Sequence, residues 1–247
     1  MFPIADSIAH RFPPFATWAL IALNFFVFIC IEELLDPDAI EALIFKFGLV
    51  PARYFDPHWA ETAGLSSSNF FPLLTDQFLH GGLFHIAANM WVLWLFGPSI
   101  EDRIGSWAFL LFYLASGMVA NFTHMALHPD SVIPIIGASG AIAGILGAYT
   151  LTYPRARLIV MVPIFIFPFF FDIAALLFTG FWFVSQFIMG LQELAHPSLN
   201  GGVAFWAHVG GFIFGLFAAL IWRFVATRDR PRFADEIYQG FPRANER

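Results

Sequence analysis

The sequence predicts an all-α membrane protein, a bundle of six transmembrane helices with a long outer first loop. Of its 247 residues, 59% are hydrophobic and only 12% are charged, whereas a soluble domain carries roughly 25% charged residues. The mean hydropathy is +0.71, and the chain contains 33 Phe and 8 Trp. A single cysteine, Cys30, excludes an intrachain disulfide and a cysteine-rich metal cluster. The solvent for most of the chain is therefore lipid.

The apolar runs locate the individual helices, because each transmembrane helix needs about 20 mainly apolar residues. They are expected at 15–33, 79–99, 106–127, 137–153, 172–191 and 203–226. Pro163 and Pro168 would interrupt a helix between the fourth and fifth spans. Residues 158–171 are therefore predicted to form an interfacial hairpin, and Asp172 to lie at an interface.

The distribution of Lys and Arg predicts that both ends of the chain are cytoplasmic. With that orientation, ten of the 12 basic residues lie in inner segments, and only Lys46 and Arg53 lie in outer ones. The outer loop from Glu32 to Leu79 is long, acidic and mixed with aromatic residues. Short helices that dip into the outer leaflet are expected there.

The membrane domain is expected to cover residues 15–226. A cytoplasmic segment, 1–14, precedes it, and a polar tail, 227–247, is expected to be cytoplasmic and disordered. No convincing small-residue cleavage site precedes the end of the first helix, so this helix is expected to remain as an anchor. The six-span form without a targeting segment indicates a bacterial inner membrane.

Four polar side chains stand in spans that are otherwise apolar: His85, Asn89, Ser139 and His208. Polar groups inside a membrane are costly, so each of them is a candidate functional residue. All three spans that carry them enter from the outer face, and at 1.5 Å per residue their depths differ by only ~6 Å. His85 and Asn89 share one helix face. One layer near the outer leaflet is therefore predicted to hold all four.

This set of side chains suits acyl transfer. A serine hydroxyl attacks a carbonyl when a base such as histidine takes its proton. The anionic intermediate then needs donors, which an Asn amide, a His N–H and the N–H groups at a helix start can supply. The glycines around Ser139 in "PIIGASGAIAGILGAY" would let a substrate backbone approach. Alternatively, the glycines serve only close helix packing; they are Gly137, Gly140, Gly144, Gly147, Gly211 and Gly215.

Four motifs follow one another along the chain. They are "FLHGGLFHIAANM" at 78–90, "FGPSIEDRIG" at 96–105, "GASG" at 137–140 and "AHVGGFIFG" at 207–215. In this order and spacing they resemble the rhomboid family of intramembrane serine proteases, over roughly residues 71–218. The resemblance implies a rhomboid-like bundle of six helices. It also implies a serine endopeptidase that hydrolyses peptide bonds in or near transmembrane segments.

The resemblance also implies roles for single residues. Ser139 resembles the nucleophile and His208 the general base of a dyad without an acid. His85 and Asn89 resemble the side chains that stabilise the oxyanion, together with the Ser139 backbone N–H. Glu101 with Arg103 resembles a structural hydrogen-bonding cluster in the loop after the second helix.

Two departures from the family pattern bear on how the site is held. Ala143 stands where many members carry an aromatic residue, so His208 is expected to be held less firmly, or by a bulky residue from elsewhere. Phe71 and Pro72 replace a Trp-Arg pair, which removes an arginine contact between the outer loop and the core.

Two further histidines raise the question of a metal. His124 and His128 are four residues apart, a spacing at which two histidines can share an ion. They stand at a helix end, and no acidic residue lies close to them in the sequence. No metal and no cofactor is therefore expected.

The predicted partners are membrane proteins with a single transmembrane segment, as substrates, and the lipid bilayer; no nucleic-acid patch is present. The alternative function is that of a catalytically inactive rhomboid-like protein that binds membrane helices. Such a protein would usually have lost Ser139 or His208. A small transporter would spread polar groups across the bilayer, whereas the inner halves of these spans are nearly all apolar.

Overall fold

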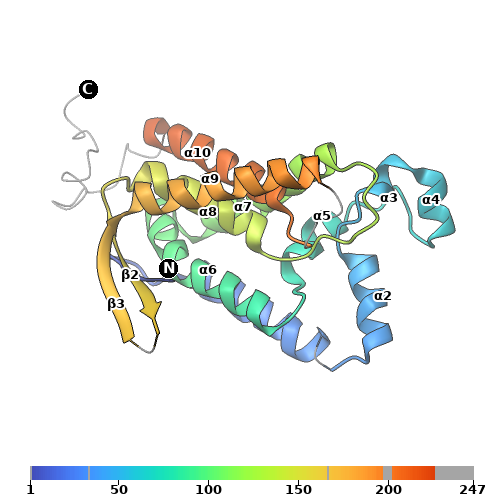
Figure 1. The fold of residues 1–247 in the computed structure, drawn as a ribbon, viewed down its shortest axis with the longest axis horizontal. Helices are drawn as coiled ribbons and strands as arrows, with labels where there is room; N and C mark the ends of the chain where they lie inside the picture. Colours follow the sequence, from blue (N-terminus) through green and yellow to red (C-terminus); the bar gives the residue numbers. More distant parts are fainter. Residues whose placement is uncertain (1, 33, 166, 197–201, 226–247) are drawn as a thin grey trace.

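The computed structural model describes residues 2–32, 34–165, 167–196 and 202–225. Six apolar helices form the bundle in Figure 1: α1 (Phe15–Val27), α6 (Leu83–Ile104), α7 (Ser106–Leu127), α8 (Ser139–Thr152), α9 (Ala175–Ala195) and α10 (Phe205–Val225). They occupy the six predicted places in the sequence. The tail predicted at 227–247 lies outside the described residues.

Four of these helices, α6, α7, α9 and α10, are long and apolar enough to cross a membrane. The other two are shorter. α1 continues into a π-helical turn, Phe28–Glu32, and α8 has only 14 residues. Nearly every residue of α8 is buried, because the other helices of the bundle surround it. A helix in that position is covered by protein along its length, so lipid does not set its length.

Glycines bring α8 and α10 into backbone contact. A Cβ on Gly211 would meet the carbonyl oxygen of Gly140, and a Cβ on Gly215 would meet that of Gly144. Only residues without side chains allow two helices to approach so closely. The packing interpretation of the glycine pattern is therefore confirmed at these positions.

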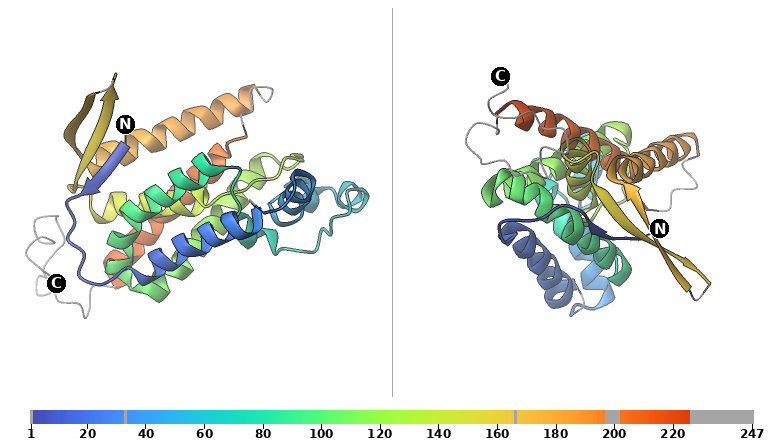
Figure 2. Two further views of the ribbon diagram at one scale, coloured as in Figure 1. Left: turned by 90° about the horizontal axis from the view of Figure 1, so that it is seen from below. Right: turned by 90° about the vertical axis from the view of Figure 1, so that its left-hand side faces the viewer.

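The all-α prediction is wrong in one respect, because the described chain contains a sheet. Strands β1 (Phe2–Asp6), β2 (Arg157–Ile164) and β3 (Phe167–Ala174) pair antiparallel in the order β1-β2-β3. The hairpin predicted at 158–171 is present, and it projects from the bundle with β1 beside it (Figure 2). It is longer than predicted, so α9 begins at Ala175 and Asp172 lies in β3, exposed and 4.0 Å from Arg157.

The composition of the hairpin explains this correction. Its phenylalanines and β-branched residues fit a pleated strand. Pro163 and Pro168 face each other across the hairpin, beyond Met161, the last residue of β2 that pairs with β1. At Pro163 β2 therefore has a neighbouring strand on one side only, the kind of edge position at which a sheet tolerates proline.

Glu101 of α6 links this helix to the starts of α1 and α7. Its carboxylate accepts hydrogen bonds from the N–H groups of Ala16 (2.8 Å) and Thr17 (2.7 Å), and from the hydroxyls of Thr17 (2.8 Å) and Ser106 (2.6 Å). The two N–H groups belong to the first turn of α1, where they have no partner within the helix. The predicted cluster is thus present, but Glu101 lies in the last turn of α6 and not in the loop after it.

The outer loop forms short helices, as predicted, at the opposite end of the bundle from the hairpin (Figure 1). They are α2 (Pro37–Phe47), α3 (Ala52–Phe55), α4 (Pro57–Thr62), α5 (Pro72–Thr75) and a 3-10 turn, Asp76–Phe78. Buried Arg53 donates to the carbonyls of Ser66 (2.9 Å) and Lys46 (3.2 Å), so an arginine inside the loop holds it together. A β-bridge from Leu49 to Ile135 joins the loop to the segment that enters α8.

Candidate active site

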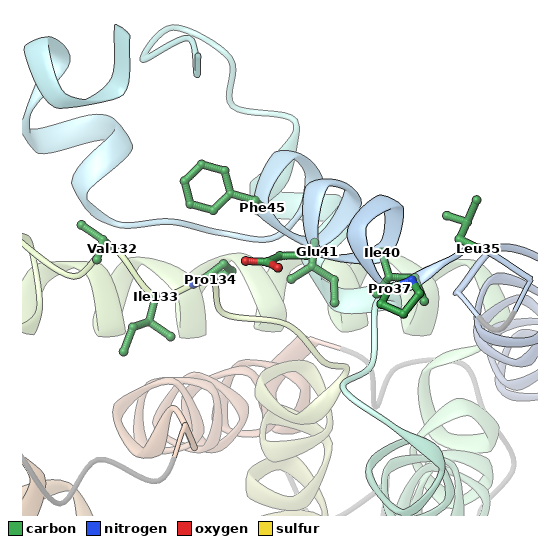
Figure 3. Close-up of a pocket in the computed structure, with 9 residues that line it drawn as sticks. Leu35, Pro37, Ile40, Glu41, Phe45, Val132, Ile133 and Pro134 are labelled. Carbon is green, nitrogen blue, oxygen red and sulfur yellow. The ribbon is translucent and has the colours of Figure 1, made fainter. Parts of the chain in front are cut away.

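Two sizeable cavities of the described chain lie at the end of the bundle that carries the outer loop. The larger, about 730 Å³, lies between α2 and residues 132–134 (Figure 3). Its lining is apolar apart from Glu41 and contains no serine, threonine, cysteine or histidine. The other, about 560 Å³, is lined by Ser139, His85, Asn89 and His208. The structure therefore brings together the four residues that the sequence singled out.

Ser139 and His208 lie in hydrogen-bonding contact. Ser139 is the first residue of α8, and His208 lies in the first turn of α10. The Oγ atom of Ser139 is 2.8 Å from Nε2 of His208. Gly140 directly follows Ser139, and Gly211 lies about one turn after His208, so the close backbone approach of α8 and α10 at these glycines brings the two side chains together.

Two side chains of α9 hold the His208 ring. Nδ1 of His208 is 2.7 Å from Oε1 of Gln186. With the proton on Nδ1, the ring donates to Gln186 and leaves Nε2 to accept from the Ser139 hydroxyl. The ring of Trp182, one turn earlier, lies with its centroid 5.7 Å from that of His208. Trp182 is thus the bulky residue expected in place of an aromatic at Ala143.

The sequence interpretation did not include Gln186. The sequence does mark Gln186 as a candidate, because it is a strongly polar residue in an apolar span. Trp182 lies four residues before it, on the same helix face. No motif draws attention to either residue.

The opposite wall of the cavity supplies N–H donors. A Cβ on Gly137, where φ is +123°, would lie 2.8 Å from Nε2 of His85 and 3.7 Å from Nδ2 of Asn89. Nδ1 of His85 accepts from the Gly81 N–H at 3.3 Å, which leaves the proton on Nε2. Among the described residues, Nδ2 of Asn89 is buried without a hydrogen-bond partner. Ser139 adds an N–H that has no partner within its helix.

The segment that enters α8 is fixed from the outer loop. The N–H of Gly137 donates to the carbonyl of Asp76 at 2.8 Å. The Asp76 side chain is buried, and this burial raises the pKa of its carboxyl well above the usual value for an aspartate. Asp76 did not stand out in the sequence, because a loop aspartate is ordinary until its burial is known.

Known proteins resemble this chain over the part that builds the site. The family model described as Rhomboid domain matches residues 67–224. Presenilin-associated rhomboid-like protein, mitochondrial, of Homo sapiens is 32% identical over 199 residues, which cover 75% of this chain and 48% of that protein. The putative rhomboid protease YdcA of Bacillus subtilis (strain 168) is 32% identical over 116 residues, 45% of this chain and 57% of that protein.

Rhomboid protease GluP of the same organism is 34% identical over 135 residues, 55% of this chain and 24% of that protein. The chain thus spans about half the length, or less, of the mitochondrial relative and of GluP. The family model, in contrast, matches well over half of the chain and includes both the Ser139 and the His208 segment. The chain belongs to the rhomboid family.

Proposed function

We propose that this protein is an intramembrane serine endopeptidase that hydrolyses peptide bonds in or near the transmembrane segments of membrane proteins. The observation that carries the proposal is the 2.8 Å contact between Ser139 Oγ and His208 Nε2. The contact lies in a cavity that Asn89 also lines. The relatives named as rhomboid proteases support this reaction class.

The geometry fits acyl transfer in two steps. His208 Nε2 takes the hydroxyl proton while Ser139 Oγ attacks the scissile carbonyl, and the oxyanion accepts from the donors on the Asn89 and Gly137 side. The C–N bond then breaks as His208 gives the proton to the leaving amine. His208 then takes a proton from a water molecule as this water attacks the ester formed on Ser139. The carboxylic acid product leaves, and the Ser139 hydroxyl is restored.

The proposed substrates are membrane proteins with a single transmembrane segment. A peptide in a helix keeps its carbonyls in hydrogen bonds, so it must unwind locally before Ser139 can attack. Small or helix-loosening residues near the outer end of a substrate helix lower that cost.

The apolar helices and the family make this an integral membrane protein. We propose that all six helices lie across the bilayer, with both ends cytoplasmic and the cavity toward the outer face. The distribution of Lys and Arg supports this orientation, because it places ten of the 12 basic residues on the inner side. The shortness of α8 is compatible with it, because neighbouring helices and not lipid surround α8. The relatives include mitochondrial and bacterial proteins, and the bacterial inner membrane remains a prediction.

A direct assay tests the proposed reaction. Purified protein in detergent or liposomes is incubated with a panel of single-span substrates, and the products are identified by mass. We expect cleavage that a serine-reactive phosphonate blocks and that a chelator leaves intact, because the chemistry uses only Ser139 and His208. Cleavage that resists the phosphonate would contradict the mechanism.

The contact between Gln186 and His208 leads to a second expectation. Replacing Gln186 with Leu removes the acceptor that fixes the ring, and should lower kcat/KM about 10- to 100-fold, as when a histidine loses its orienting partner. Gln186→Glu keeps an acceptor and should recover most of the activity at equal Tm. Gln192→Leu, at an exposed site on the same helix, is the matched control. Equal activity of the Leu and Glu variants would exclude this positioning role.

A further inference from the structure

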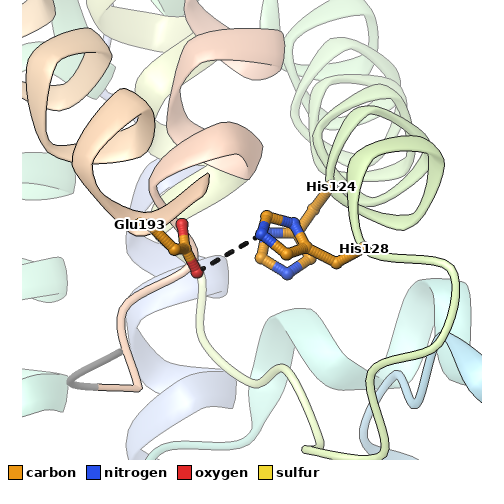
Figure 4. Close-up of side chains that lie close together, drawn as sticks. All are labelled: His124, His128 and Glu193. Carbon is orange, nitrogen blue, oxygen red and sulfur yellow. Dashed lines mark ion pairs between the residues drawn. The ribbon is translucent and has the colours of Figure 1, made fainter. Parts of the chain in front are cut away.

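A second cluster of ionisable side chains lies in the wall of the same cavity. His124 belongs to the last turn of α7, His128 follows the end of that helix, and Glu193 belongs to the last turn of α9. In Figure 4 the carboxylate of Glu193 points toward the two imidazoles. One ligand atom from each residue lies within 4.8 Å of the other two. His124 and Glu193 also line the cavity that holds Ser139.

Most polar atoms of this cluster are buried and unpaired within the described part of the chain. His124 and Glu193 are each only 5% exposed. Nδ1 of both histidines and both carboxylate oxygens of Glu193 are buried without a hydrogen-bond partner. The ion-pair contact, between His128 Nε2 and Glu193 Oε1, is 3.7 Å long, beyond hydrogen-bonding distance.

Such an arrangement is costly unless something binds it. Buried polar atoms in folded proteins are nearly always paired, and an unpaired one has lost its hydrogen bonds to water without replacement. The stacked imidazoles, with ring centroids 4.5 Å apart, place two nitrogen ligands beside one carboxylate. These are the donors that a divalent transition metal prefers.

We propose that His124, His128 and Glu193 bind a divalent transition-metal ion, for which zinc is the best match. Two imidazoles and one carboxylate form the three-ligand set of zinc sites that keep an open fourth position. Three atoms within 4.8 Å of one another share a point at most about 2.8 Å from each, close to the ~2.0–2.2 Å of zinc bonds. Small side-chain rotations therefore complete the site. Calcium and magnesium are poorer matches, because they prefer all-oxygen sites.

The position of the site suggests what the ion does. α9 carries Trp182 and Gln186, which hold His208, yet few of its own residues are buried: Ala175, Thr179, Gly190 and Glu193. An ion shared by α7 and α9 fastens the end of α9 to the bundle beside the cavity. Binding to the folded state alone stabilises it, so the ion should raise Tm.

Zinc titration of the full chain tests the site. We would use protein purified without a histidine tag, treated with chelator, and carrying Ser139→Ala so that proteolysis plays no part. Calorimetry should give one zinc ion per chain, and Tm should rise by several degrees. Glu193→Gln and His128→Ala should each weaken zinc binding at least about 10-fold and remove the rise in Tm. His196→Ala, at an exposed histidine just after α9, should bind zinc like the parent protein.

The outcomes separate a metal site from a plain ion pair. If zinc binds equally well to both variants, or if the parent protein binds no stoichiometric zinc, the proposal is wrong. If Glu193→Gln does not fold, His128→Ala decides, because the His128 side chain is 17% exposed and its truncation leaves less of a cavity. Absorption of the Co²⁺-loaded protein, which reports nitrogen and oxygen ligands in a low coordination number, must likewise be lost in that variant.

Discussion

Replacing Ser139 with Ala should abolish cleavage and leave the fold intact. The change removes the proposed nucleophile, and in a soluble serine protease the same loss costs about 10⁶ in kcat. The structural effect is small, because the hydroxyl makes one described side-chain contact, with His208. Site-specific cleavage of a single-span substrate and Tm are the two measurements. Ser68→Ala, at an exposed position of the outer loop, serves as the control.

His208 belongs to the same prediction, because nucleophile and base act as one unit. His208→Ala should reduce cleavage as far as Ser139→Ala does, and the double variant should lose little more. A folded Ser139→Ala protein that still cuts at the same bond would overturn the serine mechanism. A double variant far less active than either single variant would show that the two residues work independently.

Hydropathy could predict the helices of this fold but not its sheet. A transmembrane helix needs a long apolar segment, so the positions of such helices can be read from the sequence. The sheet depends on the pairing of residues 2–6 with residues 158–161, far along the chain. An apolar strand such as β3 shows no alternation of polar and apolar residues, so it cannot be told from a helix by its pattern alone.

The candidate site was largely predictable for a related reason. A polar side chain in an apolar helix stands out, and the four that the sequence marked do line one cavity. Gln186 is a polar residue in an apolar span, but it was missed because no motif includes it. Glu193 was missed because its partners, His124 and His128, come from a distant part of the sequence. Which faces of α7, α9 and α10 meet depends on packing that the sequence of a single helix does not contain. His124 and His128 were recognised as a pair, but their acidic neighbour comes from α9.

One residue of the candidate site, Asn89, also affects the stability of the folded protein. The buried, unpartnered Nδ2 of Asn89 lowers the stability of the folded protein, because a buried donor without an acceptor has lost its bonds to water. Proteins commonly retain such groups where function requires them. At this position, activity and stability should therefore respond to mutation in opposite directions.

Asn89→Ala should lower kcat about 10²–10³-fold, the effect of removing one oxyanion donor from a soluble serine protease. Its Tm should not fall, because the change removes an unpaired buried donor and only part of a side chain. The comparison is with Asn24→Ala: Asn24 is also buried, and although its Oδ1 has no partner among the described residues, its Nδ2 donates to the Leu20 carbonyl at 2.8 Å. That variant should lose stability and keep kcat. If Asn89→Ala instead loses Tm and retains kcat, Asn89 is structural, and the oxyanion must be bound by other donors.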